Sequence, residues 1–176
     1  MVYEARFLRN DKHVYNTNGF ICRSTYGFVS PLTNEEYRIL IDKFEDEIYI
    51  IKFYSRRDEN SNKKYSRLTN LREPRNLVET CLNVLLKNFL DLNPNASFGF
   101  IASNCENESV NNTKRFGFYK RMIANLIGEE RFAHYTKPEI SAYLLVPNSL
   151  TNHNRTLTQF NSLLEVAGFA DYVDSE

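Results

Sequence analysis

The chain contains no tryptophan, and it is poor in residue types that mark metal centres and disulfide frameworks. Its 176 residues include only 3 cysteines and 3 histidines, and neither type has the spacing of zinc ligands or of paired disulfides. We therefore expect no metal site. Cys81 falls on the apolar face of a predicted helix, so we expect it to be a core residue.

Long apolar runs are also missing. No segment approaches the roughly 18 apolar residues that a membrane span needs, and residues 1–10 carry charges where a signal peptide would be apolar. We expect a cytosolic protein with no membrane partner. The charges of the 22 basic and 22 acidic side chains cancel, so we do not expect the protein as a whole to attract nucleic acid electrostatically. A local basic patch is still compatible with this composition.

Several catalytic motifs are absent as well. The sequence has no Gly-x-Ser-x-Gly elbow, no phosphate loop and no dinucleotide fingerprint. What is present is ordinary globular composition, with 42% hydrophobic and 25% charged residues. This length and composition predict a single domain over residues 1–176.

The spacing of apolar residues predicts an α+β fold. Strands are expected at residues 3–8, 19–29, 47–57, 63–69, 97–102 and 139–146. Helices are expected at about residues 34–44, 74–89, 112–127 and 156–167. Local signals support three helix ends: a Thr33/Glu36 capping box, Pro74 in a first turn, and Gly128 in a left-handed terminal position. The order of elements predicts a mixed, mostly antiparallel sheet with helices packed on it.

One stretch has a more specific pattern, Asn112-Thr113-Lys114-Arg115-Phe116-Gly117-Phe118-Tyr119-Lys120-Arg121. Together with the order of elements over about residues 47–146, it resembles the core of the GNAT-type N-acetyltransferase superfamily. The resemblance implies that the protein uses acetyl-CoA, and that Tyr119 protonates the leaving thiolate because a phenol is a weak acid able to deliver one proton. The alternative is that Tyr119 is a core aromatic residue whose hydroxyl reaches the surface.

The turn before the long helix departs from that family. The family uses a glycine-rich turn whose backbone N–H groups hold the pyrophosphate, whereas residues 70–76 contain no glycine, and Pro74 removes one donor. Glu73 adds a repulsive charge. The resemblance then implies that side chains hold the cofactor instead, namely Arg72, Arg75, Asn76 and Asn112. The alternative is an ordinary helix start with two solvated arginines.

A basic cluster offers a second function. Lys114, Arg115, Lys120 and Arg121 lie within about two turns of the helix at residues 113–127, and Arg131 and Lys137 follow. Such a helix could recognise a protein or nucleic-acid partner without catalysis, or it could be a solvated face. The sequence therefore leaves two hypotheses: an acetyl-CoA-dependent acyltransferase acting on a small-molecule or protein amine, and a non-catalytic binding module. It does not predict the oligomeric state.

Overall fold

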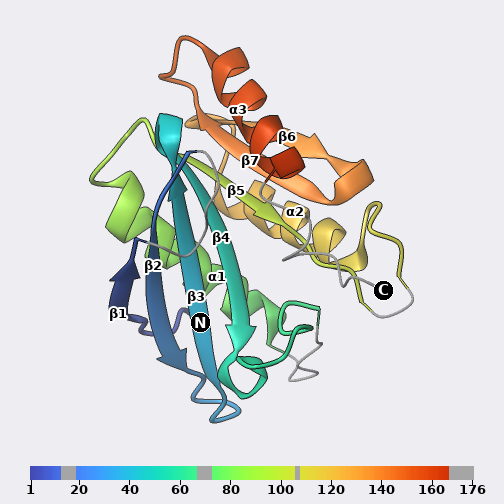
Figure 1. Cartoon of the computed structure of the whole chain (residues 1–176). Coiled ribbons are helices and arrows are strands. Elements are labelled where there is room, and N and C mark those ends of the chain that lie inside the picture. Colours follow the sequence, from blue (N-terminus) through green and yellow to red (C-terminus); the bar gives the residue numbers. More distant parts are fainter. Residues whose placement is uncertain (13–18, 67–72, 106–107, 167–176) are drawn as a thin grey trace.

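A computed structural model describes residues 1–12, 19–66, 73–105 and 108–166 (Figure 1). Within these ranges, seven strands form one sheet in the order β1-β2-β3-β4-β5-β7-β6. The strands are β1 (Arg6–Asp11), β2 (Phe20–Val29), β3 (Glu36–Phe44), β4 (Ile48–Ser55), β5 (Ser97–Ile101), β6 (Phe132–Lys137) and β7 (Ala142–Pro147). All pairs are antiparallel except β4 with β5, so the prediction of a mixed, mostly antiparallel sheet is confirmed.

Three α-helices pack on this sheet, α1 (Pro74–Leu85), α2 (Lys114–Leu126) and α3 (His153–Val166). Short helical turns complete the fold: η1 (Glu45–Glu47), η2 (Arg56–Asp58), η3 (Leu86–Leu90), which extends α1, and η4 (Pro138–Ile140). None of the helices in the described ranges combines the length and the hydropathy that a bilayer crossing requires.

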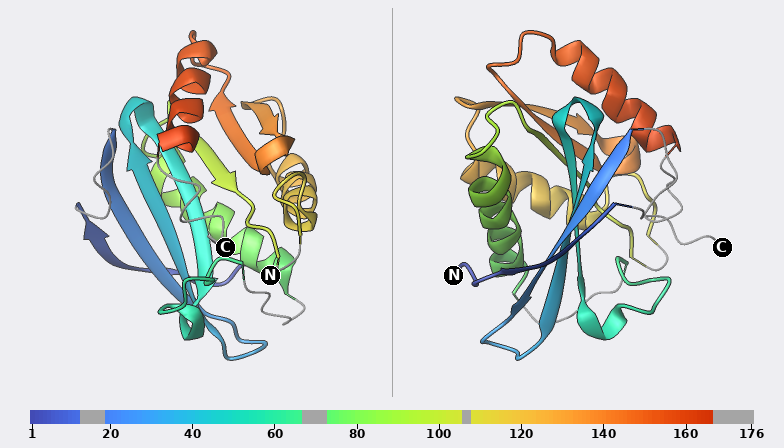
Figure 2. Two further views of the ribbon diagram at one scale, coloured as in Figure 1. Left: turned by 45° about the vertical axis from the view of Figure 1, so that its right-hand side comes forward. Right: turned by 60° about the vertical axis from the view of Figure 1, so that its left-hand side comes forward.

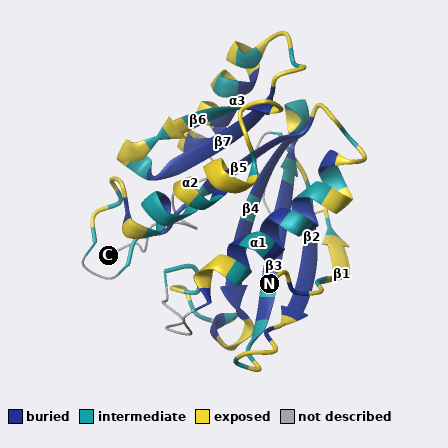
Figure 3. Ribbon diagram, turned by 180° about the vertical axis from the view of Figure 1, so that it is seen from behind, coloured by how far each residue is buried: buried dark blue, intermediate teal, exposed yellow. Residues whose placement is uncertain are grey.

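The two faces of the sheet support separate apolar cores. Because side chains alternate along a strand, Tyr37, Ile39 and Ile41 of β3 pack with α1 and α2, whereas Phe44 packs with α3. Figure 2 shows α1 and α3 on opposite sides of the sheet, and Figure 3 shows the central strands buried while the edge strand β1 is exposed. Cys81 lies in the first core, as predicted.

The helix predicted at residues 34–44 is wrong, because this segment is strand β3. Tyr37, Leu40, Ile41 and Phe44 match a helical spacing, but β3 is a central strand that is buried on both faces. Such a strand has apolar residues on both sides and imitates a helical stripe. The Thr33/Glu36 capping box is consequently absent.

Three other local predictions need correction. Residues 63–66 form turns rather than a returning strand, and Thr69 lies outside the described residues. Strand β6 was not predicted, because among its residues only Phe132 is fully buried. Gly128 does not adopt a left-handed conformation, since α2 ends instead with Ile127 in an extended conformation.

Candidate functional site

Strands β4 and β5 run side by side at their start and then part. Their parallel pairing joins Ile48 with Ser97, Tyr49 with Phe98, and Ile50 with Gly99. Beyond that point β4 continues to Ser55 paired with β3 alone, and β5 continues to Ile101 paired with β7 alone. The facing edges beyond Ile50 and Gly99 therefore carry backbone groups with no partner strand in the described parts of the chain, and Figure 1 shows the two arrows diverging.

Gly99 lies at the branch point. A Cβ atom there would come within 2.8 Å of the Phe160 ring and 3.0 Å of the Ile50 side chain. Only glycine lets α3 and β4 approach β5 this closely. Gly99 therefore permits this close packing at the last paired position before the opening begins.

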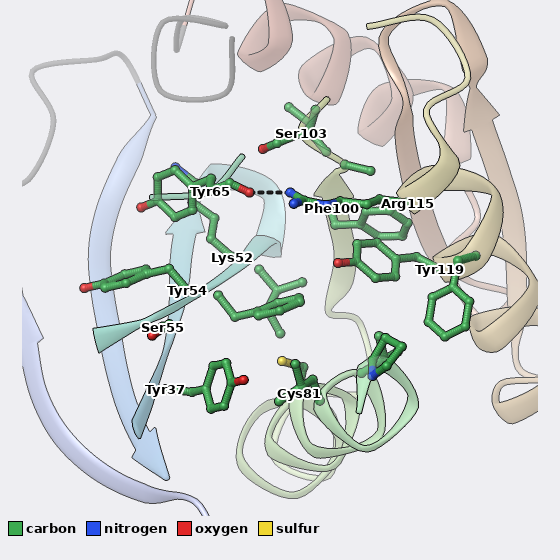
Figure 4. Close-up of a pocket in the computed structure, with 18 of the residues that line it drawn as sticks. Tyr37, Lys52, Tyr54, Ser55, Tyr65, Cys81, Phe100, Ser103, Arg115 and Tyr119 are labelled. Atoms are coloured by element: carbon green, nitrogen blue, oxygen red, sulfur yellow. Dashed lines mark hydrogen bonds between the residues drawn. The ribbon is translucent and has the colours of Figure 1, made fainter. Parts of the chain in front are cut away.

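A cavity of about 690 Å³ occupies this opening (Figure 4), and we call it the β4/β5 cleft. Its walls come from the two parted strands, the neighbouring strand β3, the helices α1 and α2, and the segment after β4. The lining residues are Tyr37; Ile51, Lys52, Phe53, Tyr54 and Ser55; Asp58, Lys64 and Tyr65; Glu73, Pro74, Leu77, Val78, Cys81 and Leu82; Phe100, Ile101, Ala102 and Ser103; and Lys114, Arg115, Phe118, Tyr119 and Ile123.

Tyr119 points its hydroxyl into the β4/β5 cleft (Figure 4). Its ring packs against Phe100, with the ring centroids 5.7 Å apart, and against Phe53 at 6.1 Å. Within the described part of the chain the hydroxyl makes no hydrogen bond. Burial raises the pKa of Tyr119 to about 12, although the nearby Arg115 guanidinium lowers it in part. The phenol therefore keeps its proton at neutral pH and has a free donor to offer.

Arg115 bridges the cleft one turn before Tyr119. Its two terminal nitrogens each donate to a main-chain oxygen, that of Tyr65 and that of Ser66, and both distances are 2.6 Å. Both acceptors are neutral, so Arg115 adds positive charge to the cleft wall. The bridge also ties α2 to the segment after β4.

Basic and aromatic side chains line the cleft beside that bridge. The Lys64 ammonium lies 5.2 Å from the centre of the Tyr54 ring and 5.3 Å from that of Tyr65. Lys52 is buried and lies 5.9 Å from the Tyr65 ring and 3.3 Å from the Asp42 carboxylate. Because Asp42 pairs with Lys52, the described lining residues leave three other basic side chains, Lys64, Lys114 and Arg115, against two acidic ones, Asp58 and Glu73. This balance favours an anionic ligand.

Glu73 lies at the start of α1, and its carboxylate is saturated with hydrogen bonds. Tyr3 and Ser30 donate to one oxygen at 2.6 and 2.7 Å, and Thr33 and Tyr37 donate to the other at 3.0 and 3.3 Å. Burial alone would raise the pKa of this carboxyl, but these four hydrogen bonds outweigh it and hold the pKa below its ordinary value. The group is therefore an ionised structural anchor.

The residues predicted to bind a cofactor do not gather at the cleft. Arg75 is exposed and pairs with Glu79 at 2.7 Å, and Asn76 donates to the Tyr3 hydroxyl at 2.8 Å. Asn112 is exposed with a positive φ of 49°, directly before Thr113, which caps α2. Arg72 lies outside the described residues. Of the predicted site residues that are described, only Tyr119 lines the cleft.

The predicted basic cluster is divided by the fold. Lys114 and Arg115 line the cleft, whereas Lys120 and Arg121 are exposed on α2. Lys137 donates to Asn161. Sequence reasoning did not single out Lys52, although a lysine within the apolar run Ile50-Ile51-Lys52-Phe53 was a signal that a buried cation is held there.

Two further observations limit the chemistry of the described residues. No three or more histidine, cysteine, aspartate or glutamate side chains among them are grouped to hold a metal ion. Cys81 lines the cleft, but burial raises its pKa far above the ordinary range, so its thiol remains protonated and is a poor nucleophile.

Comparison with known proteins adds no name to this site. No family model, no curated protein and no solved structure matches the chain. Functional inference therefore depends on the geometry of the cleft.

Proposed function

We propose that this protein is an acyltransferase that takes its acyl group from a coenzyme A thioester and transfers it to an amine, either a small molecule or a protein side chain. One observation carries the proposal: the strands part at Ile50 and Gly99, and the cleft so formed receives the Tyr119 hydroxyl, which has no hydrogen-bond partner among the described residues. The resemblance to GNAT-type acetyltransferases supplies the expectation of acetyl-CoA and the role of Tyr119.

The residues present fit such a donor in two respects. An extended arm with amide groups can hydrogen-bond to the edges of β4 and β5 that no described strand pairs with, as peptides do when they extend a sheet. Lys64, Lys114 and Arg115 offer positive charge to phosphate groups from side chains. This arrangement stands in for the glycine-rich turn that the chain lacks.

Each side chain then has a definable task. A coenzyme A thioester supplies an activated acyl carbon, which the acceptor amine bonds as the carbon–sulfur bond breaks. Tyr119 gives its proton to the leaving sulfur as negative charge develops there, and the proton that the amine releases restores the phenol through solvent. Phe53 and Phe100 hold the Tyr119 ring in place and exclude water.

Calorimetric titration with acetyl-CoA tests this proposal. We expect saturable heat, and we expect Lys114→Gln to weaken binding about tenfold, the loss of one charge-assisted contact. Lys120→Gln is the matched control, because Lys120 is also an exposed lysine on α2 but does not line the cleft. The absence of heat at millimolar acetyl-CoA would contradict the proposal.

The exposed face of α2 supports a second candidate, a non-catalytic module that recognises an acidic protein or a nucleic acid. Lys120 and Arg121 are exposed there, and Lys114, which also lines the cleft, is exposed as well. The double variant Lys120→Glu/Arg121→Glu should abolish recovery of a partner from the native host if this function holds. Unchanged recovery would leave the cleft as the only candidate site.

A further inference from the structure

The β4/β5 cleft has an apolar wall that the proposed reaction does not use. Its helix side is formed by Leu77, Val78, Cys81 and Leu82 of α1 together with Phe118 and Ile123 of α2. These positions recur on one face of α1 at the spacing of a helical stripe. Apart from the Cys81 thiol, they present only hydrocarbon to the cavity.

The two sides of the cleft therefore differ in what they can bind. The parted strand edges offer backbone donors and acceptors, which suit an arm with amide groups. The helix side offers none, so polar ligand atoms placed there would lose their hydrogen bonds to water without replacement. A two-carbon acetyl group would leave much of the apolar part of a cavity of about 690 Å³ unfilled.

The charge of the cleft agrees with a ligand that is anionic at one end. Among its described lining residues, Lys64, Lys114 and Arg115 outnumber Asp58 and Glu73, while Lys52 is paired with Asp42. A molecule with a phosphate-bearing end and a hydrocarbon end would match both the basic residues and the apolar wall.

We propose that this apolar wall is an acyl-chain site, and that the donor carries a medium-length hydrocarbon acyl group rather than acetyl. The inference rests on the proposed acyltransferase function and specifies its substrate class. The Tyr119 hydroxyl faces the same cavity, so a chain lying along α1 keeps the thioester within reach of its proton donor (Figure 4).

A calorimetric series with free coenzyme A, acetyl-, butanoyl- and octanoyl-coenzyme A tests the inference. Burial of each added methylene should tighten binding about fourfold until the wall is covered. If acetyl- and octanoyl-coenzyme A bind equally well, the acyl-chain site is overturned while the proposed function survives. If none of the four ligands binds at millimolar concentration, the proposed function fails and the inference fails with it.

Two variants that change the volume of the cleft test where the acyl chain binds. Cys81→Met fills space on the wall, and it should reduce octanoyl-coenzyme A binding at least tenfold while sparing acetyl-coenzyme A. Cys22→Met is the matched control, because Cys22 lies on β2 outside the cleft lining. Should Cys81→Met fail to fold, Ile123→Val is the alternative, because it enlarges the cavity slightly. This variant should bind longer acyl chains in preference to shorter ones. Unaltered chain preference in the folded variant would overturn the site.

Discussion

The Glu73 end and the Tyr119 side of the same cleft differ in how completely their polar groups are hydrogen-bonded. The Glu73 carboxylate receives hydrogen bonds from four hydroxyl groups, whereas the Tyr119 hydroxyl receives and donates none in the described residues. A saturated buried charge stabilises a fold, while an unsatisfied polar group facing a cavity indicates a binding or catalytic position. The cleft thus combines a structural anchor with an open chemical group.

The largest expected effect comes from breaking the anchor. Glu73→Ala removes a buried carboxylate and leaves four hydroxyl groups without their acceptor, so the free energy of unfolding should fall by about 3 kcal/mol. Urea denaturation measures it. Glu79→Ala, one to two turns along α1, removes a carboxylate whose partners, Arg75 and the N-terminal ammonium, are largely exposed, and it should cost less than about 1 kcal/mol. Equal losses would show that Glu73 is no anchor.

Removing the Tyr119 hydroxyl should have the opposite pattern of effects, with activity reduced and stability retained. Tyr119→Phe should leave the free energy of unfolding within about 0.5 kcal/mol, because its hydroxyl makes no hydrogen bond to the described residues. It should lower kcat for acyl transfer by about a hundredfold, the usual contribution of a general acid. Paired denaturation and thiol-release assays separate the two effects. A stability loss with normal turnover would assign Tyr119 to the core instead.

Low pH should reduce the contribution of Glu73 to the free energy of unfolding. The pKa of Glu73 is lower in the folded protein than its ordinary value of 4.5, so the unfolded state binds the proton first as the pH falls. The stabilisation is complete above pH 4.5 and is lost as the pH falls through the folded value, by at most about 1.4 kcal/mol per pH unit. Glu73→Gln should flatten the dependence of stability on pH below 4.5. An unchanged slope in this variant would refute the ionised state of Glu73.

The smallest expected effect comes from removing one hydrogen-bond donor to the Glu73 carboxylate. Tyr3→Phe removes the 2.6 Å hydrogen bond to Glu73 and should lower the free energy of unfolding by about 1 kcal/mol. Because Tyr3 does not line the cleft, kcat should stay unchanged. Reduced turnover at normal stability would indicate that the two ends of the cleft are coupled.

Local sequence patterns were sufficient for much of the fold. The stripe from Leu77 to Phe89 and the strand after Glu47 follow from periodicity, and both elements are present. Strand β3 was mistaken for a helix because burial on both faces removes the alternation that identifies a strand. Strand β6 was missed because an edge strand with one fully buried residue has little apolar signal.

The site was less predictable because its parts are distant in the sequence. Tyr119 could be proposed from its own helix, but the Glu73 cluster joins Tyr3, Ser30, Thr33 and Tyr37, up to 70 residues away. Arg115 looked like a surface residue, since nothing local indicates that the oxygens of Tyr65 and Ser66 receive its guanidinium. Such contacts arise from the sheet order, which local patterns do not encode.

Amide hydrogen exchange with and without a coenzyme A thioester tests most directly whether the parted strands hold the donor. We expect the ligand to slow exchange in β4 beyond Ile50 and at the end of β5 from Phe100 to Ser103, with no change at Lys120 and Arg121 on the exposed face of α2. Slowed exchange confined to α2, or no change anywhere at saturating ligand, would contradict binding in the β4/β5 cleft.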